Sequence, residues 1–187
     1  DGFVMQKTNF DYEIVISDDC STDNTKSIIN EYIQKHPKLF KDVSPRKNLG
    51  MQKNWLHTLS ECTGKYIALC EGDDYWTDAD KLQKQLDFME QHEDCALTYH
   101  PVNVVCVDGE YKYPYDKPKT MATTKDLILS HFIPTCSILF KQIPIPIKEF
   151  KILKKISGLD VALELLISLH GNFYLLNEKM ATYQQHS

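Results

Sequence analysis

Short apolar runs alternate along the chain with segments of helical periodicity. Runs of four to eight apolar residues bounded by polar residues predict strands, and apolar residues spaced three or four apart predict helices. The runs that predict strands span residues 13–17, 39–44, 66–70, 95–100, 102–107 and 136–140. This alternation is typical of an α/β fold.

The segments between these runs predict amphipathic or buried helices. One apolar face carries Ile28, Ile29, Tyr32 and Ile33 and ends before Pro37, where a helix cannot continue. Further apolar faces are formed by Trp55, Leu56, Leu59 and Cys62, and by Leu82, Leu86 and Met89. Thr77 and Asp80 have the spacing of a capping box before the second of these. Residues 123–132 predict a short helix, and residues 158–171 predict one that is largely buried.

The segment KYIALCEGDDYW, residues 65–76, passes abruptly from apolar to acidic. The uninterrupted apolar run predicts a strand buried on both faces. Glu71, Asp73 and Asp74 follow it directly, and crowded carboxylates repel one another unless a cation or hydrogen-bond donors hold them. The alternative is a solvated turn before a helix, and Asp74 alone fits that alternative better.

A second acidic pair, Asp18 and Asp19, follows the strand predicted at residues 13–17. Ligands of open α/β sheets bind outside the carboxyl ends of the strands, so parallel strands would bring both acidic loops to one edge. Carboxylates at such an edge suit Mg²⁺ or Mn²⁺. The alternative is that Asp18 and Asp19 only cap the following helix.

Length and composition limit the protein class. The 187 residues are 42% hydrophobic and 25% charged, which favours one globular domain. The net charge of −5 argues against a nucleic-acid partner. No apolar run approaches the ~20 residues that span a bilayer, and no signal peptide is expected. The six cysteines lack metal-site spacing, so we interpret them as reduced thiols of a cytoplasmic protein.

Three segments, taken in order, resemble the inverting family 2 glycosyltransferases of the GT-A fold. They are YEIVISDDCSTDNT, NLG and GKYIALCEGDDYW. The likeness continues through SILF and through SGLDVALELLISLHGNFYLLNEKMATYQQH. It implies a GT-A domain with a mixed, mostly parallel sheet and helices on both faces. The expected activity is transfer of a sugar from a nucleotide-diphosphate donor to an acceptor hydroxyl.

The resemblance also implies site residues. Asp160 matches the family's catalytic base, and Glu71 and Asp73 match its metal-binding acidic motif, with His186 as a late residue at the metal and the diphosphate. The positions that match donor-binding residues are Asp18, Asp19, Asn48, Gly50 and Asp74. The implied cofactor is Mg²⁺ or Mn²⁺.

The chain departs from the family pattern at several positions. Glu71 replaces the commoner Asp, Cys20 stands where Gly is frequent, and Gln184 stands where Arg is often found. Asp160 lacks the usual acidic neighbour. Only DGFVMQKTNF precedes the strand at residues 13–17, where the family has a strand and a helix, so we expect a single domain that is a fragment trimmed at both ends.

The expected partners are a nucleotide-sugar donor, with a UDP-sugar favoured, and a saccharide or lipid-linked saccharide acceptor in cell-surface polysaccharide synthesis. The expected location is the cytoplasm, with the inner face of the membrane as an alternative. Two other functions stay open: an inactive GT-A-like nucleotide-binding or scaffold domain, and a sugar-1-phosphate nucleotidyltransferase. A Rossmann dehydrogenase is excluded because the chain has no G-x-G-x-x-G motif.

Overall fold

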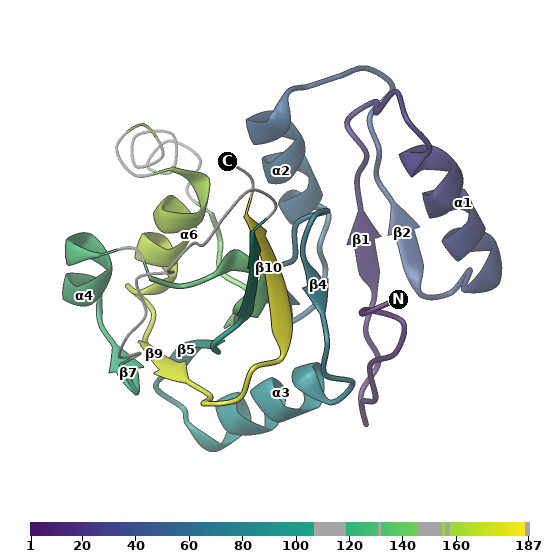
Figure 1. Cartoon of the computed structure of the whole chain (residues 1–187). Helices are drawn as coiled ribbons and strands as arrows, with labels where there is room; N and C mark the ends of the chain where they lie inside the picture. The colour runs from purple at the N-terminus through teal and green to yellow at the C-terminus, as the bar shows by residue number, and fades with distance from the viewer. Residues whose placement is uncertain (107–118, 131, 146–154, 156–157, 186–187) are drawn as a thin grey trace. The chain divides into compact units, whose positions relative to one another are not determined.

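The computed structural model describes residues 1–106, 119–130, 132–145, 155 and 158–185 (Figure 1). The Asp108–Gly109 turn and most of the loop at residues 111–120 lie outside them. The chain forms two compact units. The small unit is Phe10–Lys65, and the large unit combines Asp1–Asn9 with the chain from Tyr66 onward. Whether they form the single domain expected from the sequence stays a prediction.

The small unit contains a parallel strand pair and two helices. The strands are β1 (Ile14–Ile16) and β2 (Phe40–Asp42), with Ile14 opposite Phe40. The helices are α1 (Thr25–Lys35) and α2 (Met51–Ser60). As predicted, α1 ends before Pro37. Its apolar face is only partly covered, because Ile29 is buried while Ile28 is 52% exposed.

The large unit contains two sheets and three α-helices among its described residues. The strands are β3 (Tyr66–Ala68), β4 (Tyr75–Trp76), β5 (Cys95–Tyr99), β6 (Asn103–Cys106), β7 (Met121–Ala122), β8 (Leu139–Lys141), β9 (Asn172–Leu175) and β10 (Ala181–Gln185). The helices are α3 (Lys81–Gln91), α4 (Thr124–Leu129) and α6 (Leu159–Ile167), and a 3-10 turn, η1, spans Thr135–Ser137. These elements confirm the α/β class.

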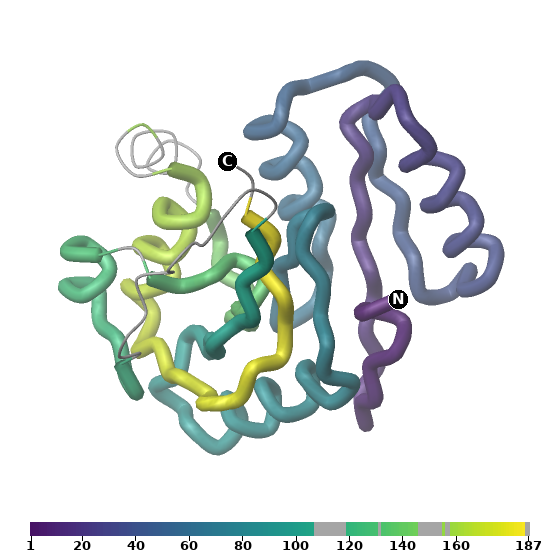
Figure 2. The backbone as a smooth tube through the Cα atoms, in the orientation of Figure 1, coloured from purple at the N-terminus to yellow at the C-terminus, as the bar shows by residue number. Residues whose placement is uncertain are grey.

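The strand pairing is mixed. One sheet has the order β3-β8-β5-β9-β7 and the other β4-β10-β6. In the five-stranded sheet only β5 and β9 pair in parallel, so the expectation of mostly parallel pairing is wrong there. The cause is β8, which leaves η1 and runs antiparallel between β3 and β5. In the second sheet β10 runs parallel to β6 and antiparallel to β4 (Figure 2).

The core of the large unit surrounds β5. All five residues of this central strand are buried, and α3 packs against it. Helix α6 buries most of its surface, as its apolar composition predicts, and lies beside α4. Burying the predominantly apolar surfaces of β5 and α6 gives the large unit its main stabilisation.

The first nine residues pack against the start of α3. The Gln6 side chain donates to the Asp78 carbonyl at 2.8 Å and accepts the Leu82 N–H at 3.1 Å. The predicted capping box is wrong: Asp80 is the N-cap residue, but its side chain makes no capping hydrogen bond. Gln6, distant in sequence, satisfies this end of the helix instead.

Gly171, between α6 and β9, is required by backbone geometry. Its φ is +154°, and a Cβ atom would lie 2.4 Å from the Asp94 carbonyl oxygen. We expect Gly171→Ala to lower the free energy of unfolding by about 3 kcal/mol, measured by urea denaturation. Gly72→Ala is the control, because a Cβ atom there meets nothing within 4 Å. Equal stability of the two variants would contradict this description of the turn.

Candidate active site

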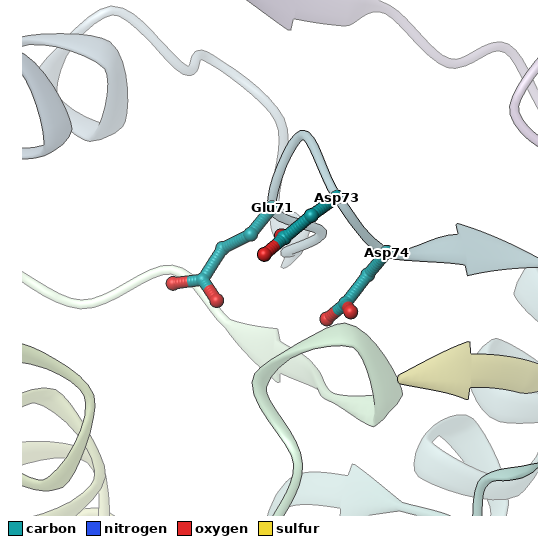
Figure 3. A group of neighbouring side chains, drawn as sticks. All are labelled: Glu71, Asp73 and Asp74. Carbon is teal, nitrogen blue, oxygen red and sulfur yellow. The ribbon is translucent and has the colours of Figure 1, made fainter. Parts of the chain in front are cut away.

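Three carboxylates converge on the loop between β3 and β4. Glu71, Asp73 and Asp74 each offer an oxygen, and these oxygens lie within 4.8 Å of one another. Figure 3 shows the three side chains extending from the loop toward a common region. Glu71 and Asp73 are exposed, whereas Asp74 is buried. We call these three residues the acidic cluster.

Local hydrogen bonds fix the buried member of this cluster. The loop turns where the Asp74 N–H donates to the Glu71 carbonyl at 3.2 Å. Asp74 Oδ1 accepts the backbone N–H of Gln184, on β10, at 2.8 Å. The Cys136 thiol, on η1, lies near the same carboxylate, because burial and then the Asp74 charge raise the pKa of this thiol. The interpretation of Asp74 as an exposed helix approach is therefore wrong, because this side chain is buried and accepts a hydrogen bond from β10.

The electrostatics of the acidic cluster are those of crowded negative charges. The pKa of Glu71 is raised to about 7, first by burial around its carboxyl group and then by the charges of Asp74, Asp73 and Asp160. The pKa of the Cys70 thiol is raised to about 12 by burial and then by the Asp74 charge. A divalent cation fits these residues, because it would compensate the repulsion with oxygen ligands already gathered.

Asp160 lies in the first turn of α6, near Glu71, whose pKa it helps to raise. Its Oδ1 atom accepts the Val161 N–H at 2.9 Å, so the carboxylate also stabilises the positive end of the helix. Gly158, with φ +93°, precedes it, and a Cβ atom there would lie 3.0 Å from Asp160 Oδ1. The large unit therefore brings together four of the predicted residues. His186 lies outside the described residues.

The small unit holds the other predicted residues, beginning with Asp18. This side chain is buried, and its Oδ1 accepts both the backbone N–H and the hydroxyl of Ser21. The Asp18 N–H in turn donates to Ser44 Oγ at 2.9 Å. Asp18 thus shapes the loop after β1 from inside.

Asp19 connects two loops of the small unit. Its Oδ1 accepts the Leu49 N–H at 2.7 Å, and its carbonyl accepts from Asn48 Nδ2 at 2.8 Å. The Asn48 side chain also accepts the Gly50 N–H at 3.0 Å, and Gly50 has φ +82°. The NLG motif and the DD motif therefore form one hydrogen-bonded structure.

The capping alternative for Asp18 and Asp19 is wrong. The N-cap residue of α1 is Asn24, and no side-chain cap hydrogen bond is formed. The expected single sheet edge is also not found: β1 pairs with β2, and β3 pairs with β8 in a different sheet. Among the described residues, no strand pairing joins β1 to β3. Convergence of the two acidic loops stays a prediction.

The positions of Gln184 and Cys136 beside Asp74 could not be predicted from the sequence. Gln184 contributes a backbone N–H, which any residue except proline supplies, so its side chain carries no signal. The apolar run at residues 136–140 predicts Cys136 in a strand, yet it lies in η1, where the Asp74 charge helps to raise the pKa of its thiol. All six cysteines are thiols, and Cys20 is exposed rather than part of the core. The one signal in the sequence for the burial of Cys136 is its place in the apolar run at residues 136–140.

Most of the chain matches the sequence profile of a known protein family. Residues 3–144 match the sequence profile described as "Glycosyl transferase family 2". The chain belongs to this family. The match covers the DD motif, the NLG motif and the acidic cluster, while Asp160 lies beyond it.

Similar proteins come from several bacteria. An uncharacterized protein of Mycobacterium tuberculosis is 35% identical over 189 residues, covering 100% of this chain and 54% of the relative. TuaG of Bacillus subtilis, provisionally named a teichuronic acid biosynthesis glycosyltransferase, is 33% identical over 114 residues, covering 61% of this chain and 43% of TuaG. The chain therefore spans about half the length of the curated relatives that it matches.

Solved structures show the same GT-A fold. The crystal structure of S. aureus TarS 1-349 in complex with UDP aligns with a TM-score of 0.70 at 18% identity, covering 95% of this chain and 53% of that TarS fragment. The mannosyltransferase PcManGT from Pyrobaculum calidifontis, in complex with GDP-Man and Mn²⁺, aligns with a TM-score of 0.66 at 14% identity. That alignment covers 97% of this chain and 50% of PcManGT. In the part of the chain that the structure describes, no helix is long and apolar enough to cross a membrane.

Proposed function

We propose that this chain is the donor-binding and catalytic part of a glycosyltransferase. In this proposal it transfers a sugar from a nucleotide-diphosphate donor to an acceptor hydroxyl, with inversion of the anomeric centre and dependence on a divalent cation. The observation that carries the proposal is the acidic cluster with the Asp160 carboxylate close to it. Membership of family 2 supports the reaction type.

Glu71, Asp73 and Asp74 are the residues that would hold Mg²⁺ or Mn²⁺. When bound, the ion would supply Lewis-acid neutralisation of the charge that develops on the leaving diphosphate. The support is the gathering of three carboxylates within 4.8 Å, with Glu71 at a raised pKa. Asp74 is the buried member of the three, and the Gln184 N–H of β10 would hold its carboxylate in position for the ion.

Asp160 would act as the catalytic base. An acceptor hydroxyl is a poor nucleophile near neutral pH, and a carboxylate that takes its proton as the new bond forms lowers the barrier. The Val161 N–H, which donates to Asp160 Oδ1 at 2.9 Å, holds this carboxylate at the start of α6.

Asp19, Asn48 and Gly50 would bind the nucleotide, with Asp18 shaping the loop. Their support is the hydrogen-bonded structure that joins the DD and NLG motifs. A UDP-sugar is the proposed donor, in line with the UDP complex of TarS. The proposed acceptor is a saccharide or lipid-linked saccharide of the cell surface, reached in the cytoplasm at the inner face of the membrane.

A turnover assay tests the proposal. The chain would be incubated with UDP-sugars, Mn²⁺ and saccharide acceptors, and both released UDP and the anomeric configuration of the product, by NMR, would be measured. The expected result is acceptor-dependent UDP release that EDTA stops, with an inverted product. Binding of UDP without release for any sugar would instead favour the inactive binding domain.

A further inference from the structure

A lysine side chain is completely enclosed beneath the acidic loop. Lys81, the first residue of α3, is 0% exposed. Its Nζ atom donates to Gln85 Oε1 at 2.6 Å and lies 4.3 Å from the centroid of the Trp76 ring. Burial lowers the pKa of this amine to about 7. A buried lysine that only filled space would be replaceable by an apolar side chain with no loss of stability.

Both residues that Lys81 contacts, Trp76 and Gln85, donate hydrogen bonds to η1. The indole Nε1 of Trp76 donates to the Cys136 carbonyl at 3.0 Å. Nε2 of Gln85 donates to the Ser137 carbonyl at 2.9 Å. The amine of Lys81 therefore contacts two side chains that are hydrogen-bonded to consecutive residues of this turn.

From η1 the connection continues to the acidic cluster. Cys136 lies near Asp74, whose charge helps to raise the pKa of the Cys136 thiol. Trp76 also lies only two residues beyond Asp74 and opposite Ala181 of β10, the strand whose Gln184 N–H binds Asp74. Lys81 is thus connected to Asp74 in two ways, through the residues of η1 and through Trp76 of β4.

The charge of Lys81 acts in the same region. Asp74, Glu71 and Asp73 raise the pKa of the Cys70 thiol, whereas Lys81 lowers it. The amine and the three carboxylates therefore all lie close enough to affect one thiol.

We propose that Lys81 is a positioning residue for the acidic cluster, because it locks Trp76 and Gln85 against η1 and so fixes Asp74 beside Asp73 and Glu71. This inference rests on the proposed cation site. Residues that orient metal ligands from behind change metal affinity by about 10- to 100-fold when they are replaced. Lys81 has no contact with the cation in this proposal and acts through Trp76, Gln85 and Asp74.

The test compares Lys81→Met with Lys84→Met, the next lysine on α3. In the described part of the chain, Lys84 forms ion pairs with Asp78 and Glu178, and neither Trp76 nor Gln85 is among its hydrogen-bond or ring partners. Both variants would be made in a Trp55→Phe chain, so that fluorescence reports Trp76 alone. The measurements are Mn²⁺ affinity by electron paramagnetic resonance, Trp76 emission and the thermal unfolding midpoint.

The expected result for Lys81→Met is at least about tenfold weaker Mn²⁺ binding and a changed Trp76 spectrum, in a protein that still unfolds cooperatively. Lys84→Met should keep both the affinity and the spectrum. If Lys81→Met does not fold, Lys81→Gln serves instead, because it keeps a hydrogen-bond donor and removes the charge.

Two outcomes overturn the inference in distinguishable ways. A changed Trp76 spectrum with unchanged Mn²⁺ affinity would show that Lys81 supports only the core. Failure of the parent chain itself to bind Mn²⁺, with or without UDP, would refute the proposed cation site and the inference with it.

Discussion

Replacing Asp73 with alanine is expected to abolish Mn²⁺-dependent binding of UDP. Asp73 is an exposed member of the acidic cluster, so its carboxylate is available to a cation and to the diphosphate beside it. Loss of one of three oxygen ligands should weaken Mn²⁺ binding by at least about 100-fold, since even residues behind the ligands change affinity by 10- to 100-fold. Mn²⁺ binding by electron paramagnetic resonance, with and without UDP, measures the effect.

The matched control is Asp80→Ala, a carboxylate removed from the same stretch of chain. Asp80 is exposed, and it makes no capping hydrogen bond to α3. Its replacement should leave Mn²⁺ and UDP binding unchanged. Equal affinities of Asp73→Ala and the parent chain would reject Asp73 as a metal ligand.

Asp160→Asn is expected to abolish sugar transfer while leaving donor affinity nearly intact. Asparagine keeps an oxygen that can accept the Val161 N–H, so the start of α6 should be preserved. It cannot take a proton from the acceptor, and loss of a general base typically costs about 10²- to 10⁴-fold in rate. Steady-state turnover and UDP affinity, measured on the same preparation, separate the two effects.

A fall in UDP affinity that matches the fall in turnover would instead place Asp160 in donor binding. Near-normal turnover of Asp160→Asn would remove it from the role of base. The unfolding midpoint should stay close to that of the parent chain, because the variant is isosteric. That measurement guards against an indirect loss through α6.

Local patterns in the sequence were sufficient for most elements. The apolar runs predict β1, β2, β3 and β5, and the faces of α1, α2 and α3 follow the helical period, because both signals depend only on neighbouring residues. The acidic ending of residues 65–76 predicted the cluster for the same reason. Ser21, Asn48 and Gly50 lie in the loops where their motifs placed them.

Long-range contacts were beyond the sequence. Strand β4 is two residues long and exists because β10 pairs with it, so no local pattern predicts it and Asp74 alone fits a helix approach better. Gln6 contacts the start of α3 across more than seventy residues and replaces the predicted capping box. The burial of Lys81 has no signal in the neighbouring sequence, because it depends on the folded positions of Trp76 and Gln85.

The most direct test of the donor site is calorimetric titration of UDP into this chain in the presence of Mn²⁺ and again in the presence of EDTA. The acidic cluster predicts binding with Mn²⁺ and strongly weakened binding with EDTA, because the diphosphate would share the cation with Glu71 and Asp73. Equal UDP affinity in both conditions, or no binding in either, would contradict a metal-dependent donor site in this protein.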